Sequence, residues 1–231
     1  MRVEVWSDIV CPWCYLGKAR FEAALAAFEH RDQVEVVHRS FELDPGFPTD
    51  QVVSVLDMLT SKYGLSRDQA AEAEAGMARM AAAEGLEFSA DRPHGNTFDA
   101  HRLMHLARDR GRADEMLARL YRANFGAERS VFDTGSLVTI AGQAGLDTAE
   151  AARVLAGDDY ADAVRGDERR AAELGATGVP FFVIDGALAI SGGQRAEVFL
   201  QALREAWSHS HGSVTDVDAP LGDRDSEFHP G

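Results

Sequence analysis

The chain has 231 residues, of which 45% are hydrophobic, so it can bury a sizeable core as one domain with an insertion or as two small domains. Its formal net charge is −15, from 23 basic and 38 acidic residues. That charge argues against nucleic acid and anionic membranes as partners, because both bind clustered Lys and Arg.

The N-terminal residues do not resemble a targeting segment. A secretory signal needs a basic region and then about 7–15 apolar residues, whereas Glu4 and Asp8 interrupt the start of this chain. No apolar run approaches the roughly 18 residues that cross a membrane. We therefore expect a cytoplasmic protein, and there a close pair of cysteines is more often catalytic or metal-binding than structural.

The first forty residues predict a strand, a helix and a second strand. Apolar and polar side chains alternate over residues 2–5, as in a half-buried strand. Apolar side chains then recur at helical spacing over residues 15–28, and a β-branched run over residues 34–41 suits a second strand.

The two cysteines of the chain, Cys11 and Cys14, lie between the first strand and the helix, separated by Pro12 and Trp13. Proline is well placed in a first helical turn. A thiol at a helix N-terminus meets unpaired N–H groups, which favour the nucleophilic thiolate. Taken alone, the motif allows redox chemistry, a zinc site or a structural disulfide.

After a cluster of breakers at residues 43–48, the pattern is helical up to about residue 174. Helix starts and stops are recognisable from caps and glycines. The predicted helices run from Ser66, with Gln69 completing a capping box, to Gly85; from Asn96 or Thr97 to Gly111; up to Gly126; from Asp147 to Gly157; and from Asp159 to Leu174. We expect residues 43–175 to form an all-helical insertion.

Strand character returns after Pro180. Two apolar runs, residues 181–184 and 187–190, flank an Asp-Gly pair, which is a strong hairpin signal, and a last helix follows. Residues 208–231 are polar and acidic and are expected to form a tail that is poorly ordered or docks late.

Strands near both ends of the chain predict one α/β domain built from residues 1–42 and 176–207. This order of elements around a CxxC motif resembles a thioredoxin fold, and the helical insertion resembles its DsbA-like branch. Three motifs resemble the FrnE group, which is related to 2-hydroxychromene-2-carboxylate isomerases and kappa-class glutathione transferases. They are Cys-Pro-Trp-Cys-Tyr-Leu-Gly from residue 11, Asn-Thr-Phe-Asp-Ala-His-Arg from residue 96 and Gly-Ala-Thr-Gly-Val-Pro-Phe-Phe from residue 175.

The resemblance implies that Cys11 attacks a partner disulfide and that Cys14 resolves the mixed disulfide. It also implies a cis peptide bond before Pro180 and pairing of the Val179 backbone with a substrate peptide; an ordinary trans proline at a strand start is the alternative. Pro12 and Trp13 would contact the substrate and tune the redox potential. Because Trp13 is uncharged, we expect a pair less oxidising than the ~−120 mV extreme.

Ser191 and Gly192 precede the last helix, where exposed N–H groups can hold an anion. Glutathione-using relatives dock the carboxylate of the tripeptide in this area. The resemblance therefore implies glutathione or another low-molecular-weight thiol as an optional co-substrate, with no tightly bound cofactor. A glycine-rich turn with a serine cap is the alternative.

Two histidines, His101 and His105, have the i, i+4 spacing of metal ligands, but we interpret them as one helix face and expect no metal. Asp8 would oppose thiolate formation at Cys11 if it lay close, or it lies solvated at the rim. Asn96 is interpreted first as a helix cap.

Two functional hypotheses remain. The first is a thiol–disulfide oxidoreductase acting on protein or small-molecule disulfides. The second is a glutathione-dependent isomerase or transferase, whose relatives typically carry serine where this chain has Cys11. The presence of both cysteines favours the first, and disfavours a non-catalytic binding module. Exposed apolar helices in the insertion would also allow a homodimer.

Overall fold

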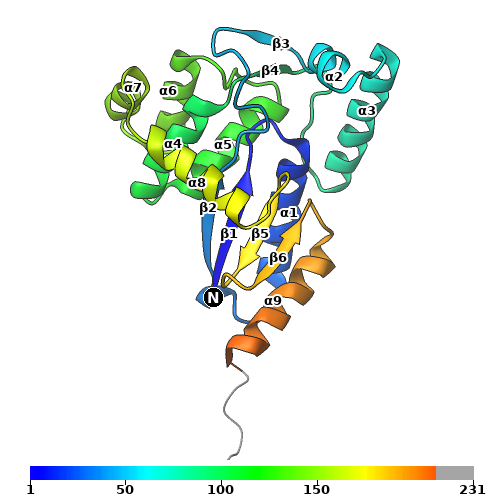
Figure 1. Ribbon diagram of the computed structural model, residues 1–231, viewed down its shortest axis with the longest axis vertical. Helices are drawn as coiled ribbons and strands as arrows, with labels where there is room; N and C mark the ends of the chain where they lie inside the picture. Colours follow the sequence, from blue (N-terminus) through cyan, green and yellow to red (C-terminus); the bar gives the residue numbers. More distant parts are fainter. Residues whose placement is uncertain (212–231) are drawn as a thin grey trace, which may run out of the picture.

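The computed structural model describes residues 1–211 (Figure 1). The strands are β1 (Arg2–Ser7), β2 (Glu35–Ser40), β3 (Val52–Ser54), β4 (Pro93–Gly95), β5 (Phe181–Ile184) and β6 (Leu188–Ser191). The α-helices are α1 (Pro12–Ala27), α2 (Val55–Tyr63), α3 (Arg67–Ala83), α4 (Phe98–Asp109), α5 (Ala113–Phe125), α6 (Thr134–Gln143), α7 (Thr148–Ala156), α8 (Ala161–Glu173) and α9 (Ala196–His211).

The central sheet has the strand order β2-β1-β5-β6. β1 and β2 are parallel, whereas β5 pairs antiparallel with both β1 and β6. Strands from the two ends of the chain therefore share one sheet, as the sequence predicted. The thioredoxin-like α/β fold with a large, mainly helical insertion of the DsbA-like type is confirmed.

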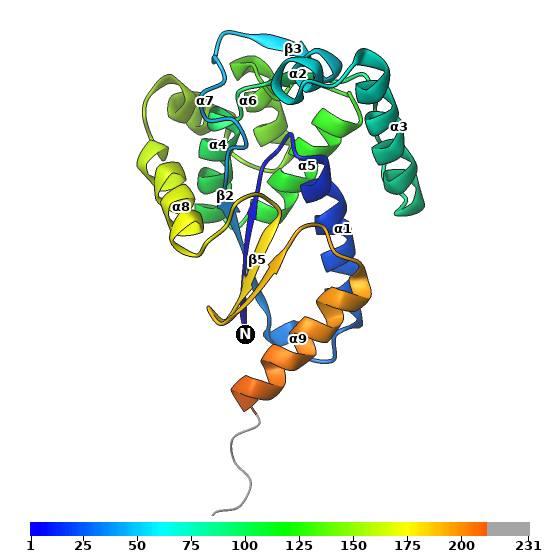
Figure 2. The same ribbon diagram turned by 45° about the vertical axis from the view of Figure 1, so that its right-hand side comes forward.

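Helices cover both faces of this sheet (Figure 2). Val3 and Val5 of β1 pack with Phe21 of α1 and with α9, while Trp6 points to the other face and packs against Ala171 of α8. Side chains on both faces of β1 are therefore buried, which explains why apolar and polar residues alternate only weakly along this strand. β1 is an interior strand, paired with β2 and β5, and its C-terminal end leads straight into the cysteine motif.

Most of the predicted helix ends in the insertion are confirmed, because their signals are local. Ser66 and Gln69 form the expected capping box, and the side chain of Asp147 accepts a hydrogen bond from the Glu150 amide. Gly85 and Gly111 follow their helices with φ values of 71° and 65°, the left-handed region that glycine enters at little cost.

The insertion is not entirely helical, which corrects one detail of the prediction. β3 and β4 form a small antiparallel sheet in which Val52 pairs with Gly95. Each strand has only three residues, and β4 contains Pro93 and Gly95, which sequence patterns treat as breakers. The Phe132 ring packs closely against β4, because a Cβ at Gly95 would lie 2.9 Å from it.

The last helix is longer than predicted. α9 continues to His211, so residues 208–211 are helical and not part of a tail. Trp207 explains the extension, because its ring stacks on His30 at 4.1 Å and on His211 at 3.7 Å between centroids. The rest of the expected acidic tail lies outside the described residues. Among residues 1–211, none of the helices has the length and apolar character needed to cross a membrane.

Candidate active site

The two cysteines lie at the start of α1, as predicted. Cys11 is the N-cap residue and Pro12 occupies the first turn. The Cys11 carbonyl accepts hydrogen bonds from the amides of Cys14 and Tyr15, at 3.1 and 3.2 Å. Both cysteines are free thiols, and each is buried, with 3% and 2% of its surface exposed.

Val179 and Pro180 lie against this motif. Their peptide bond is cis, which confirms the expectation for Pro180. The Cys11 thiol donates to the Val179 carbonyl at an Sγ–O distance of 3.6 Å. Pro180 also reaches the helix, because a Cβ on Gly17 would lie 3.0 Å from its Cγ. Residues from the N-terminal part and from the C-terminal part of the chain thus meet at the thiols.

Ser191 and Gly192 lie next to Pro180, outside the groove that borders Cys11. The Gly192 amide donates to the Pro180 carbonyl at 2.8 Å, and the Gln194 amide donates to the Gly192 carbonyl at 2.9 Å. These N–H groups are engaged within the loop. The anion site expected here would therefore rely on other donors, such as the Ser191 hydroxyl.

We predict that Gly193→Ala destabilises the protein by about 1–3 kcal/mol, the usual cost of forcing atoms into a packed site. A Cβ at Gly193 would lie 2.8 Å from the Trp13 carbonyl oxygen and 3.3 Å from the Gly17 nitrogen, both backbone atoms that cannot rotate away. The control is Gly178→Ala, where the added methyl meets open space. Denaturant unfolding measures both, and equal stability of the two variants would contradict this account.

The environment of Cys14 disfavours its thiolate. Burial raises the pKa of Cys14 well above its ordinary value, and the adjacent Cys11 raises it further. Burial likewise raises the pKa of Tyr121, whose ring is 1% exposed. The two thiols therefore differ in surroundings: Cys11 borders the groove, whereas Cys14 lies inside the protein and needs a base to become nucleophilic.

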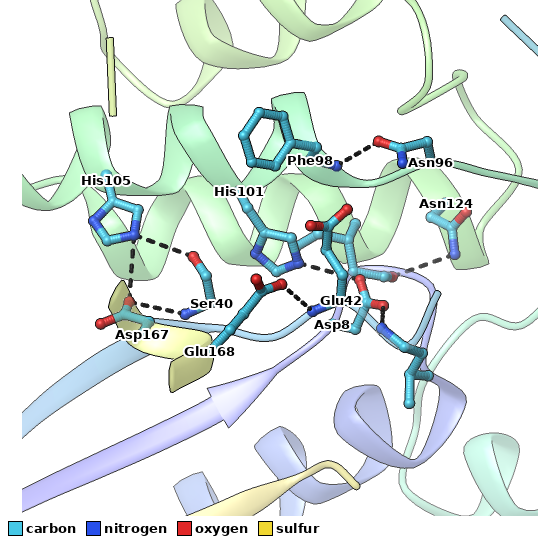
Figure 3. A network of polar contacts seen from close by, with 12 residues as sticks. Asp8, Ser40, Glu42, Asn96, Phe98, His101, His105, Asn124, Asp167 and Glu168 are labelled. Carbon is cyan, nitrogen blue, oxygen red and sulfur yellow. Dashed lines mark hydrogen bonds and ion pairs between the residues drawn. The ribbon is translucent and has the colours of Figure 1, made fainter. Parts of the chain in front are cut away.

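A buried polar network lies beside the cysteine loop (Figure 3). Asp8 accepts hydrogen bonds from the Leu43 amide at 2.7 Å and from His101 Nε2 at 3.2 Å. Burial favours a raised Asp8 pKa, but His101 and the Leu43 amide outweigh it and the pKa is lowered. The side chain is 1% exposed, so the alternative of a solvated position at the rim is wrong.

His101 and His105 contact two different carboxylates, so α4 carries two separate polar contacts. His105 Nε2 lies 3.2 Å from the Ser40 hydroxyl and 3.3 Å from Asp167 (Figure 3). Across residues 1–211, His, Cys, Asp and Glu side chains do not gather into a group of three that could hold a metal ion. Asn96 acts as expected at the start of α4, where its side chain accepts from the Phe98 amide at 2.9 Å.

A groove of about 510 Å³ borders Cys11. On the motif side it is lined by Val10, Cys11, Pro12, Trp13 and Val179. The opposite wall is supplied by α2, α3 and β4; it includes Met58, Leu59, Met77, Met80 and His94. The methionines recur at helical spacing, but that pattern looks the same in a core helix.

Charged residues in the groove are paired, so its surface is largely apolar. Arg92 forms an ion pair with Glu74, and both are at least 95% buried. Lys62 contacts Asp44 at 2.8 Å. Trp13 remains 44% exposed at the edge of the groove, where an apolar ligand could cover it.

A helix-opening pair of thiols facing a cis-proline, on a four-stranded sheet covered by helices, is the arrangement of a thioredoxin-fold protein. Residues 2–204 match the family described as DSBA-like thioredoxin domain. The chain belongs to this DsbA-like family, as its motifs suggested.

The relatives support the same assignment. The crystal structure of a probable DsbA oxidoreductase from Streptomyces coelicolor is 58% identical, has a TM-score of 0.89 and covers 100% of both chains. The uncharacterized protein YwbO of Bacillus subtilis (strain 168) is 31% identical over 208 residues, 89% of this chain and 96% of its own. The cytosolic disulfide reductase DsbM from Pseudomonas aeruginosa shares the fold, with a TM-score of 0.61, 19% identity, and coverage of 90% and 100%.

Proposed function

We propose that the protein is a thiol–disulfide oxidoreductase in which Cys11 attacks and Cys14 resolves. The observation that carries this proposal is the asymmetry of the two thiols. Cys11 lines an open groove next to the Val179 carbonyl, whereas Cys14 does not line that groove. A substrate disulfide in the groove therefore meets Cys11 first.

The exchange would proceed in two balanced steps. The Cys11 thiolate forms a bond with one substrate sulfur, and the other substrate sulfur leaves with the electron pair of the broken S–S bond. Cys14 loses its proton and bonds to Cys11, and the second substrate sulfur leaves as a thiolate. The substrate gains two electrons and the Cys11–Cys14 pair loses them; reversal oxidises a dithiol.

The groove suits an apolar segment of a protein or a small disulfide, because its charges are paired internally. In this proposal Trp13 and Pro12 contact the substrate, and the Val179 backbone pairs with it. Glutathione is a second candidate for the groove or for Ser191 and Gly192, since DsbM has also been solved with GSH. The cytosolic location in the name of DsbM supports our assignment of this chain to the cytoplasm.

The isomerase or transferase hypothesis remains the second candidate, but this chain presents two free thiols at the site. In that alternative glutathione would supply the sulfur and Cys14 would be idle. A homodimer stays a prediction, which light scattering would test.

The test of the proposed function is reduction of insulin by dithiothreitol with and without the protein, together with the reduction potential of the cysteine pair. We expect faster precipitation of insulin and a potential below that of the ~−120 mV oxidants. A protein that neither accelerates the reaction nor exchanges with glutathione would refute the proposal.

A further inference from the structure

A second cavity, of about 110 Å³, lies next to Cys14 and is separate from the groove. Cys14 lines this cavity and not the groove, while Cys11 lines the groove and not the cavity. The polar residues that share the cavity with Cys14 include Ser7, His38, Asp114 and Tyr121. The resolving thiol thus borders a separate cavity whose lining is mostly apolar, with these polar side chains among the lining residues.

His38 reaches this cavity from β2. It is the cross-strand partner of Val5, which also lines the cavity, and its Nε2 lies 2.7 Å from the Asp114 carboxylate at the start of α5. The Asp114 side chain is 84% exposed and that of His38 only 9%. The pair therefore links solvent to the buried cavity, and the hydrogen bond from His38 lowers the pKa of Asp114, which stays ionised.

Two buried polar atoms near this cavity have no hydrogen-bond partner among residues 1–211: His38 Nδ1 and the Tyr121 hydroxyl. Buried polar groups without protein partners are usually satisfied by water. A cavity needs only about 10–15 Å³ to hold one water molecule, so this one has room for a short chain. Water can therefore connect the Cys14 thiol with the free nitrogen of His38.

We propose, on the basis of the proposed function, that the His38–Asp114 pair is the proton acceptor for Cys14, acting through water in this cavity. When Cys14 resolves the mixed disulfide, its proton moves to His38 Nδ1, and the sulfur electron pair forms the Cys11–Cys14 bond. The leaving substrate sulfur takes the electron pair of the broken bond. The imidazolium is stabilised by the Asp114 carboxylate and returns the proton when the disulfide is reduced.

The other charged groups around His38 do not replace it. Lys18 and Glu22 of α1 line the same cavity, but they form an ion pair with each other. On its other side His38 borders a small pocket with Arg39, His101, His105 and Arg108. Arg39 is bound to Glu4 and Asp167, and the two histidines are hydrogen bonded elsewhere.

The test follows the two thiols separately by stopped flow, using the reduced protein and excess dithiodipyridine. Cys11 releases the first thiopyridone, and Cys14 releases the second as it resolves the mixed disulfide. In His38→Gln we expect the second phase to slow on the order of 10²-fold, as for loss of a general base, while the first phase is unchanged. The second phase should also become proportional to hydroxide concentration, and imidazole should accelerate it in His38→Ala.

Asp114→Asn provides a second variant at an exposed position, in case the His38 variants fold poorly, and should slow the second phase by a smaller factor. Glu115→Gln, at the next residue of the same turn, is the matched control and should change neither phase. An unchanged second phase in His38→Gln, equal slowing of both phases, or an unaltered pH profile would each overturn the proposal. A wild-type protein that releases no second thiopyridone would instead overturn the proposed function.

Discussion

Replacing Cys11 by serine is expected to reduce insulin reduction by this protein to the rate of dithiothreitol alone. A serine hydroxyl cannot form the mixed disulfide, so the first exchange step is lost and not merely slowed. The loss should exceed that of any other substitution, because Cys11 is the thiol that lines the groove. Insulin turbidity, followed at several protein concentrations, measures the effect.

Cys14→Ser is the matched comparison, because it leaves Cys11 free to attack but removes the resolving thiol. A mixed disulfide with the substrate should then accumulate and appear in mass spectrometry as one added substrate per chain. The chain has only two cysteines, so the adduct must lie on Cys11. Full turnover by Cys11→Ser, or an adduct on Cys14 in that variant, would show that the roles are reversed.

Replacing Asp8 by asparagine is expected to cost about 3–5 kcal/mol in the free energy of unfolding, the usual effect of removing one partner of a buried ion pair. Asp8 and His101 are 1% and 2% exposed, so neither charge can be solvated if its partner is lost. His101 would also lose its main polar contact. Denaturant unfolding near the mildly acidic pH at which both groups are charged measures this loss.

The pH dependence should identify the two charges. The Asp8 pKa is lowered from 3.8, so its contribution is present above that value and is lost as the pH falls through the folded pKa. Burial opposes the charge of His101, but Asp8 outweighs it and raises the His101 pKa above 6.5. That contribution is present below 6.5 and is lost as the pH rises through the folded pKa.

The stability difference between wild type and Asp8→Asn should therefore be largest at pH values between the lowered pKa of Asp8 and the raised pKa of His101, and smaller at lower and higher pH. Asp158→Asn, at an exposed position, is the control and should show no such maximum. A difference that does not vary with pH would mean that the pair is not ionised and that Asp8 acts through neutral hydrogen bonds.

Local patterns predicted those parts of the protein that depend on neighbouring residues. The capping box at Ser66, the stop at Gly85 and the Asp185-Gly186 turn all follow from the sequence, because caps and tight turns are short-range structures. The short strands β3 and β4 were missed, since they pair only when residues far apart in the chain meet. The continuation of α9 to His211 depends on a contact with His30, far away in sequence.

The sequence by itself determined the chemistry available to this protein: two thiols on one helix start, a distant proline opposite them, and the family to which these motifs belong. Only the tertiary structure decided how the two thiols differ. Cys11 lies on an apolar groove completed by the insertion, whereas Cys14 lies on a separate cavity that it shares with His38 and Asp114. No sequence spacing encodes that difference, because it arises where β2, α1 and α5 pack together.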